Sequence, residues 1–229
     1  MIIETQGLKK LYRTDLVETT ALDSVDFHVD AGQFVSIMGP SGCGKSTLLH
    51  ILGLIDTPND GSYRFLGEEV SRYPEAQRAA IRKRNIGFVF QSFNLIDELT
   101  VYENIELPLL YARVSAQERR AKVDAVLERM DIGHRRDHLP GQLSGGQQQR
   151  VAVARAVVHK PNLVLADEPT GNLDSEHGAE VMKILVNLHE EGTSIVMVTH
   201  SPDNAAYAER TVRMLDGRVM AERRPGQPS

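Results

Sequence analysis

The feature that most constrains this chain is a glycine-rich turn between an apolar run and a helical pattern. The turn follows the pattern G-x-x-x-x-G-K-[ST] and consists of Gly39, Pro40, Ser41, Gly42, Cys43, Gly44, Lys45, Ser46 and Thr47. The apolar run 34–38 precedes it, and apolar residues at helical spacing follow it to Leu52. This order predicts a phosphate-binding loop, because glycines let backbone N–H groups surround an anion at the positive end of a helix. The alternative is a glycine turn beside a surface lysine.

Two side chains of this turn have predicted roles of their own. We expect Lys45 to reach the terminal phosphates of a nucleotide and the Ser46 hydroxyl to ligate Mg²⁺. Cys43 lies near the start of the following helix, where backbone dipoles favour a thiolate. We therefore expect thiol reagents to inactivate the protein and Mg-ATP to protect it.

The rest of the pattern indicates an α/β fold. Apolar runs predict strands, the first two antiparallel and the third leading into the loop, over residues 8–12, 21–29, 34–38, 62–66, 86–90, 163–168 and 194–199. Asp216-Gly217 is a hairpin signal near the end. Residues 74–84 and the segment after Asp174 read as helices. We expect a phosphate-loop NTPase core with a mostly parallel sheet and an N-terminal antiparallel β part.

The segment 92–141 changes character. Helical periodicity covers 101–107 and 116–130, and Ser115 with Glu118 predicts a capping box for the second helix. No strand pattern interrupts this segment. The sequence therefore predicts one domain over 1–229, with a helical subdomain at 92–141 inserted into a core made of 1–91 and 142–229.

Polar side chains stand directly after several predicted strands, where ligands of open α/β sheets bind. Asp167 and Glu168 end one strand; Asp167 can hold Mg²⁺, and Glu168 can polarise a water for attack on the terminal phosphate. His200 ends another strand, where it either contacts that phosphate or is an ordinary histidine. Gln91 ends a third, and by itself it reads as a loop residue. Tyr12, on a strand edge, either stacks on a base or packs within its sheet.

A second possible anion site opens the helix after Leu143. Ser144, Gly145 and Gly146 precede an alanine-rich helical stretch, so backbone donors are exposed at a second helix N-terminus. The alternative is merely a capped helix. Two phosphate cradles so far apart in one chain need an explanation.

At Leu143-Ser144-Gly145-Gly146-Gln147 the chain resembles the nucleotide-binding domain of ATP-binding cassette proteins, and the resemblance covers essentially its whole length. The motifs occur in the family's order: the loop 39–47, Gln91, residues 143–147, the strand 163–168, Asp174 and His200. The resemblance implies that two chains pair head to tail, so that the Ser144–Gly146 turn of one covers the ATP held by Lys45 of the other.

The resemblance also implies roles for single residues. Tyr12 resembles the residue that stacks on adenine, Glu168 the catalytic base and His200 the γ-phosphate switch. Gln91 resembles the residue that contacts Mg²⁺ and the attacking water while sensing a membrane partner. Gln147 extends the second cradle, and Asp174 resembles the link across the dimer.

Within the family, residues 166–174 and the glutamines at 147–149 resemble the branch of macrolide exporters, lipoprotein-release, cell-division and bacitracin-resistance ATPases. Asp97 departs from the proline that many relatives carry there, at a contact with the partner. We expect an ATP-hydrolysing subunit with a separate integral membrane permease, positioned in the cytoplasm on the inner face of the membrane. Phe93, Leu95 and Tyr102 either receive a partner helix or belong to the subdomain core.

Composition agrees with this expectation. The 229 residues are 41% hydrophobic and 25% charged, and no apolar run is long enough to span a membrane. One cysteine excludes an internal disulfide framework, and the net charge of −5 disfavours nucleic acid as a partner. Two alternatives remain: a soluble cassette ATPase that acts on nucleic acid or the ribosome, and a switch that binds ATP without hydrolysing it. Glu168 argues against the second.

Overall fold

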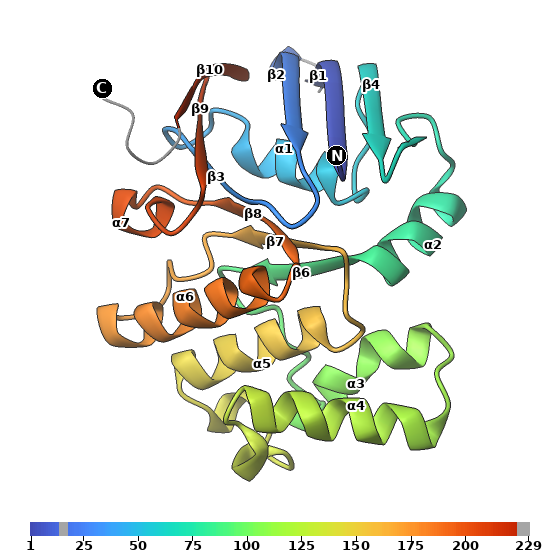
Figure 1. Cartoon of the computed structure of the whole chain (residues 1–229), viewed down its shortest axis with the longest axis vertical. Helices are drawn as coiled ribbons and strands as arrows, with labels where there is room; N and C mark the ends of the chain where they lie inside the picture. Colours follow the sequence, from blue (N-terminus) through green and yellow to red (C-terminus); the bar gives the residue numbers. More distant parts are fainter. Residues whose placement is uncertain (14–17, 224–229) are drawn as a thin grey trace.

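The main sheet has six strands and forms the middle layer of the molecule in the computed structural model, which describes residues 1–13 and 18–223 (Figure 1). Its order is β10-β9-β3-β8-β7-β6. The bounds are β3 Phe34–Met38, β6 Ile86–Phe90, β7 Leu163–Asp167, β8 Ser194–Val198, β9 Arg210–Leu215 and β10 Arg218–Arg223. All neighbours pair in parallel except β9 and β10, which form the hairpin expected around Asp216-Gly217.

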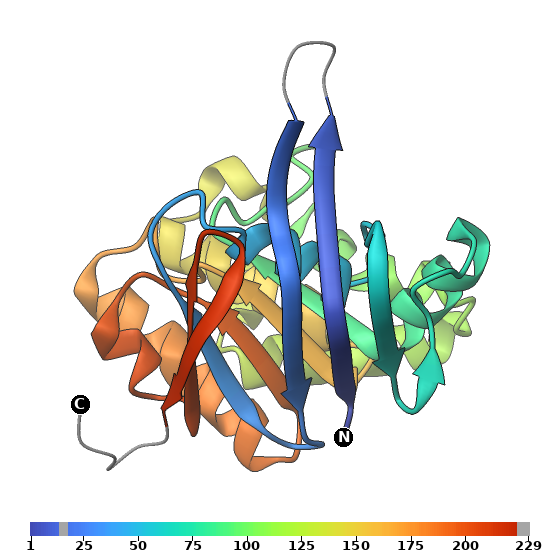
Figure 2. The same ribbon diagram turned by 90° about the horizontal axis from the view of Figure 1, so that it is seen from above.

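A second, antiparallel sheet covers one side of this core. Its order is β2-β1-β4-β5, with bounds β1 Ile3–Arg13, β2 Glu18–Val29, β4 Asp60–Phe65 and β5 Glu68–Glu69. Strands β1 and β2 extend past the rest of the molecule (Figure 2). The antiparallel pairing of the first two strands is confirmed. Both strands are longer than their apolar runs because main-chain pairing continues through polar residues.

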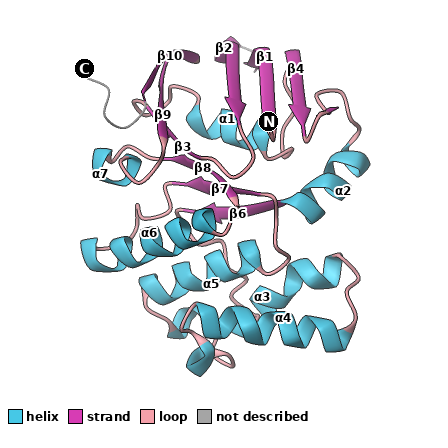
Figure 3. Ribbon diagram, viewed as in Figure 1, coloured by secondary structure: helices cyan, strands magenta, loops and turns pink. Residues whose placement is uncertain are grey.

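Helices surround the main sheet and gather mostly on its other side (Figure 3). Helix α1 (Lys45–Leu52) lies between the two sheets, while α5 (Gly145–Val157) and α6 (Ser175–Glu190) cover the opposite face. Beyond α5 lie α3 (Val101–Tyr111) and α4 (Ala116–Arg129). The remaining helices are α2 Glu75–Asn85, the short α7 Pro202–Ala205, and the 3₁₀ turns η1 Gly133–Arg135 and η2 Pro140–Gln142.

The core consists of two apolar clusters, one on each face of the main sheet. In β7, Leu163 and Leu165 belong to the cluster around α1, whereas Val164 and Ala166 belong to the cluster around α5 and α6. This alternation follows from the two-residue repeat of a strand. It explains why the central strands are continuously apolar, since both of their faces are covered.

Helix starts are fixed by their capping residues. Thr100 with Glu103, and Ser144 with Gln147, form capping boxes at the starts of α3 and α5. The box predicted for α4 is only half formed: Ser115 accepts a hydrogen bond from the Glu118 backbone, but the Glu118 side chain pairs with Lys122 at 2.9 Å. An i,i+4 cation therefore competes with the reciprocal bond.

The fold expected from the sequence is confirmed, and details differ. Strand β5 and helix α7 were not anticipated, because each has fewer residues than a pattern needs to be recognised. The subdomain boundaries at 92 and 141 stay a prediction. Among the residues that the structure describes, no helix is long and apolar enough to cross a membrane.

Candidate nucleotide-binding site

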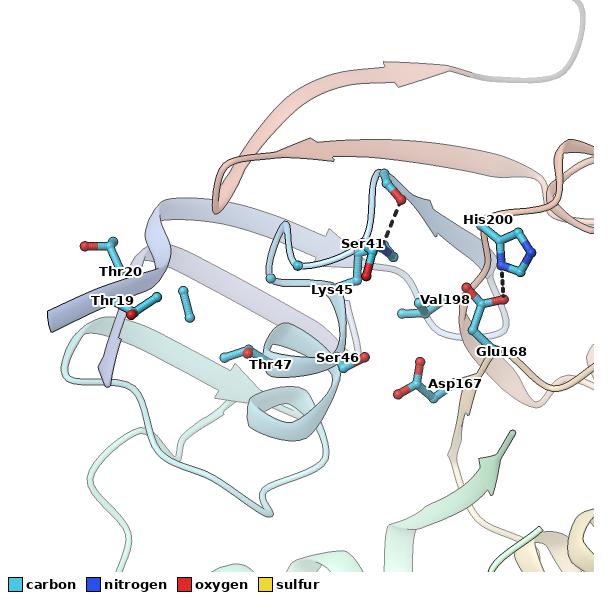
Figure 4. A pocket seen from close by; sticks show the side chains of 14 residues that line it. Thr19, Thr20, Ser41, Lys45, Ser46, Thr47, Asp167, Glu168, Val198 and His200 are labelled. Atoms are coloured by element: carbon cyan, nitrogen blue, oxygen red, sulfur yellow. Dashed lines mark hydrogen bonds and ion pairs between the residues drawn. The ribbon is translucent and has the colours of Figure 1, made fainter. Parts of the chain in front are cut away.

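Three adjacent parallel strands bring the predicted phosphate loop, carboxylates and histidine to one edge of the sheet. The order β3-β8-β7 places the turn after β3, His200 after β8, and Asp167 with Glu168 at the end of β7. A pocket of about 390 Å³ opens there (Figure 4). Its lining includes Thr19, Thr20, Ala21, Gly39, Ser41, Gly42, Gly44, Lys45, Ser46, Thr47, Asp167, Glu168, Val198 and His200.

Two glycines of the loop are required by close approaches of other backbone segments. Gly44 has φ +99°, and a Cβ there would lie 2.3 Å from the carbonyl oxygen of Ala21. At Gly39 a Cβ would lie 2.3 Å from the carbonyl oxygen of Met214. Helix α1 begins directly after Gly44 and has no acidic residue in its first turn. Its positive end therefore faces the pocket without an internal anion.

Lys45 is held over the loop. Its Nζ donates hydrogen bonds to the carbonyl oxygens of Gly39 at 2.9 Å and Pro40 at 2.8 Å, and its side chain is otherwise buried. The ammonium group therefore stands among the backbone groups of the loop, where it can neutralise the charge of a bound phosphate.

Asp167 lies beside Ser46, which follows Lys45 at the start of α1 (Figure 4). Burial raises the pKa of Asp167; the hydrogen bond from Ser46 and the positive charges of His50 and Lys45 oppose this rise. Within the described residues no group of three acidic, histidine or cysteine ligands lies together. One carboxylate and one hydroxyl fit Mg²⁺, which keeps several waters and takes other ligands from phosphate oxygens.

Glu168 and His200 form a pair across the mouth of the pocket. Glu168 Oε2 and His200 Nδ1 are 2.9 Å apart, with Glu168 mostly buried and His200 exposed. Glu168 has a left-handed backbone with φ +47°, and its N–H donates to the Val198 carbonyl oxygen at 3.0 Å. A strained backbone held by the neighbouring strand turns this carboxylate toward the pocket. The arrangement suits a base oriented by a histidine.

Tyr12 lies beside this pocket rather than among its lining residues. The residue is 43% exposed, its hydroxyl donates to Asp56 at 3.0 Å, and Lys10 Nζ lies 5.1 Å from the centroid of its ring. Thr19 pairs with Tyr12 across β1 and β2 and lines the pocket together with Thr20. Both threonines belong to no sequence motif, so the sequence does not predict them; only the strand register reveals them.

Cys43 does not present its thiol to the pocket. The side chain is 4% exposed and packs in the cluster around α1. This burial opposes the expected reaction with thiol reagents, which stays a prediction. The backbone of Cys43 remains part of the loop.

Gln91 is not among the residues that line this pocket. Its side-chain amide donates to Asn172 Oδ1 at 3.1 Å, and Asn172 donates back to the Gln91 carbonyl oxygen at 3.0 Å. Gly171 allows this contact, because a Cβ there would lie 2.7 Å from Gln91 Nε2. Phe90 nevertheless pairs with Asp167 across β6 and β7. Gln91 follows Phe90 directly, so its backbone lies at the end of the sheet that carries the carboxylates.

The second cradle lies outside this pocket. None of Ser144, Gly145, Gly146, Gln147 and Asp174 is among the pocket residues. Ser144 and Gln147 cap α5, and Asp174 caps α6 through the His177 backbone at 2.9 Å. The phosphate loop and the predicted second anion site are therefore not parts of one pocket.

The sheet, the phosphate loop and the two carboxylates define a phosphate-loop ATPase. The family model described as "ABC transporter" matches residues 22–171, and the chain therefore belongs to this family. It is an ATP-binding cassette that hydrolyses ATP, and the expected family is confirmed.

The similarity of this chain to relatives and to solved structures extends over nearly its whole length. An uncharacterized ABC transporter ATP-binding protein of Thermotoga maritima is 48% identical over 98% of this chain and 96% of its own length. The macrolide export ATP-binding/permease protein MacB 1/2 of Paracoccus denitrificans is 46% identical, and this chain spans only 34% of it. A dimeric ATP-binding cassette in a post-hydrolysis state, bound to ADP and Pi, matches with a TM-score of 0.90 at 40% identity, covering 97% of this chain and 98% of that one.

Proposed function

We propose that this ATPase powers a membrane transporter or mechanotransmission complex by acting on an integral membrane permease that is a separate chain. The observation that carries the proposal is the division of the ATP site: the pocket holds Lys45, Asp167, Glu168 and His200, while the Ser144–Gly146 cradle lies elsewhere. Relatives support it, because some join such a cassette to a permease, whereas others have about the length of this chain.

The divided site implies a homodimer arranged head to tail. The Ser144–Gly146 turn of each chain then covers the terminal phosphate held at Lys45 of the other, and two ATP molecules lie at the interface. Asp174 links the two chains. The solved cassette that shares this fold over nearly its whole length is dimeric, which supports the pairing of two chains.

Within each site the residues have distinct roles. Backbone N–H groups of residues 39–47 and Lys45 bind the phosphates, and Tyr12 stacks on the adenine beside Thr19. Ser46 and Asp167, with Gln91 after closure, would hold Mg²⁺, which supplies charge neutralisation at the phosphates. Glu168 accepts a proton from the attacking water, and His200 orients Glu168.

The permease contact is a groove between α2, β6, α3 and α5. Its volume is about 650 Å³, and its floor carries the parallel rings of Phe88 and Phe90, 5.6 Å apart. Tyr111, 70% exposed, forms one wall, and Arg82, Lys83 and Arg155 add basic groups. An apolar helix with an acidic residue fits this lining. Leu95 and Tyr102 are partly buried against the core, which favours the second of the two alternatives given for them, that they belong to the subdomain core. Phe93 does not line this groove either.

This partner would hold the ATPase in the cytoplasm at the inner face of the membrane. The test is capture from native membranes: the tagged Glu168→Gln chain is extracted in mild detergent with Mg-ATP and its partners are identified. We expect a permease with few membrane spans and a large external domain. Recovery with ribosomes or nucleic acid, without a membrane protein, would favour the soluble alternative.

A further inference from the structure

Asp174 and His177 form a close pair at the start of α6. His177 Nδ1 lies 2.7 Å from one carboxylate oxygen of Asp174 and 2.9 Å from the other. The His177 backbone N–H donates to the same carboxylate at 2.9 Å. The Asp174 side chain, which we assign to the link between chains, is therefore fixed almost entirely by one residue.

The imidazole of His177 also packs against the second phosphate cradle. A Cβ at Gly146 would lie 2.5 Å from His177 Cδ2 and 2.9 Å from Cγ, so only glycine leaves room for this ring. His177 thus contacts Asp174 and Gly146, which are far apart in the sequence and both face the second chain in the proposed dimer. The side chain itself is 41% exposed, so protons reach it freely.

The charges around the ring favour its protonated form. The hydrogen bond with Asp174, and then its negative charge, raise the pKa of His177; Glu180 and Glu176 on α6 add to this. On α5, Arg150 pairs with Glu180 at 2.7 Å, and its positive charge offsets part of the effect of that carboxylate on His177. The pKa of Asp174 is lowered by its bonds with His177.

We propose that protonated His177 is a positioning residue that holds Asp174 against the Ser144–Gly146 cradle and makes ATP-driven dimerisation tighter at neutral pH than at alkaline pH. The inference rests on the proposed head-to-tail dimer. The imidazolium adds a positive charge beside a cradle that receives a phosphate of the other chain. The neutral ring keeps at most one Nδ1–H donor and loses that charge.

The pH range follows from the direction of the shift. The ion pair is complete below the ordinary histidine pKa of 6.5 and is lost as pH rises through the raised value. Dimerisation should therefore weaken above neutral pH, and substitutions at His177 should remove this dependence of dimerisation on pH.

The first test measures the pair in the absence of nucleotide. Histidine NMR titration of the full chain should give His177 a pKa above the ordinary histidine value of 6.5. Asp174→Asn should lower the pKa of His177. If the pKa of His177 is not above 6.5, or if Asp174→Asn leaves it unchanged, the inference is overturned.

The second test measures dimerisation in the Glu168→Gln background with Mg-ATP between pH 6.5 and 9. We expect the ATP concentration for half-maximal dimerisation to rise at least about fivefold, the lower end of ordinary coupling between sites. His177→Asn, which keeps an amide donor but no charge, should flatten this profile, while the control His134→Asn should leave it unchanged.

The outcomes separate the two claims. Equal pH profiles in the parent and in His177→Asn would contradict the role of His177 but leave the dimer intact. A parent chain that forms no dimer at any of these pH values would contradict the proposed function as well.

Discussion

At the scale of single residues, Glu168 is placed by a strained backbone and oriented by His200 at 2.9 Å. Glu168→Gln keeps the size of the side chain but cannot accept a proton. We expect ATP binding to remain and phosphate release to fall by about 100- to 10,000-fold, the usual contribution of a general base. Glu68→Gln, an exposed change in β5, is the control. Undiminished phosphate release would exclude Glu168 as the base.

Asp167 offers a pH-dependent prediction. Because burial raises its pKa, the ionised side chain destabilises the ligand-free fold, and this cost grows as pH rises through the raised value. Asp167→Asn should therefore raise the melting temperature of the ligand-free chain at pH 7 and abolish stabilisation by Mg-ATP. The gain in melting temperature caused by Asp167→Asn should become smaller as the pH is lowered. A lower melting temperature at pH 7 would show that its hydrogen bonds outweigh desolvation.

Gly44 tests the geometry of the loop. Alanine is strained at positive φ by about 1–3 kcal/mol at either Gly44 or Gly67, but only at Gly44 would the Cβ collide with another backbone segment. Gly44→Ala should lose ATP binding, whereas Gly67→Ala should lose stability alone. Calorimetric titration with ATP checks both variants, and equal affinities would mean that the loop adapts to the collision.

At the scale of elements, the groove between α2, β6, α3 and α5 shares no lining residue with the ATP pocket, so partner binding can be tested separately from catalysis. Tyr111→Ala removes an exposed wall and should abolish recovery of the membrane partner without changing ATP hydrolysis by the isolated chain. Tyr207→Ala, 46% exposed on another surface, is the matched control. Recovery of the partner with Tyr111→Ala would place the contact elsewhere.

Elements with strong patterns were predictable, and single contacts were not. Strand β6 is Ile86–Phe90 as expected, because an apolar run bounded by polar residues needs no tertiary information. Gln91 directly follows it, yet its amide turns to Asn172, which lies 81 residues away in the chain. Thr19 enters the pocket only through its pairing with Tyr12. Such contacts depend on the register between strands and on loop conformation, which periodicity does not encode.

At the scale of the whole molecule, the phosphate loop and the Ser144–Gly146 turn do not share one pocket, and we propose that a second chain completes each ATP site. The central claim is that the Ser144–Gly146 turn of one copy closes on the nucleotide of the other. Gly145 is the position at which to test it, because a Cβ there meets its neighbours only at ordinary contact distances of 3.5 Å or more. Glutamate at this position adds a charge that repels a phosphate.

The most direct measurement is the mass of the Glu168→Gln chain by sedimentation, with and without Mg-ATP. We expect one chain of 25.4 kDa without nucleotide and twice that mass with it. Gly145→Glu in the same background should stay monomeric while still binding ATP, and Gly133→Glu, with the same change of charge, should dimerise. A monomer in ATP, or a dimer that tolerates Gly145→Glu, would contradict the head-to-tail arrangement.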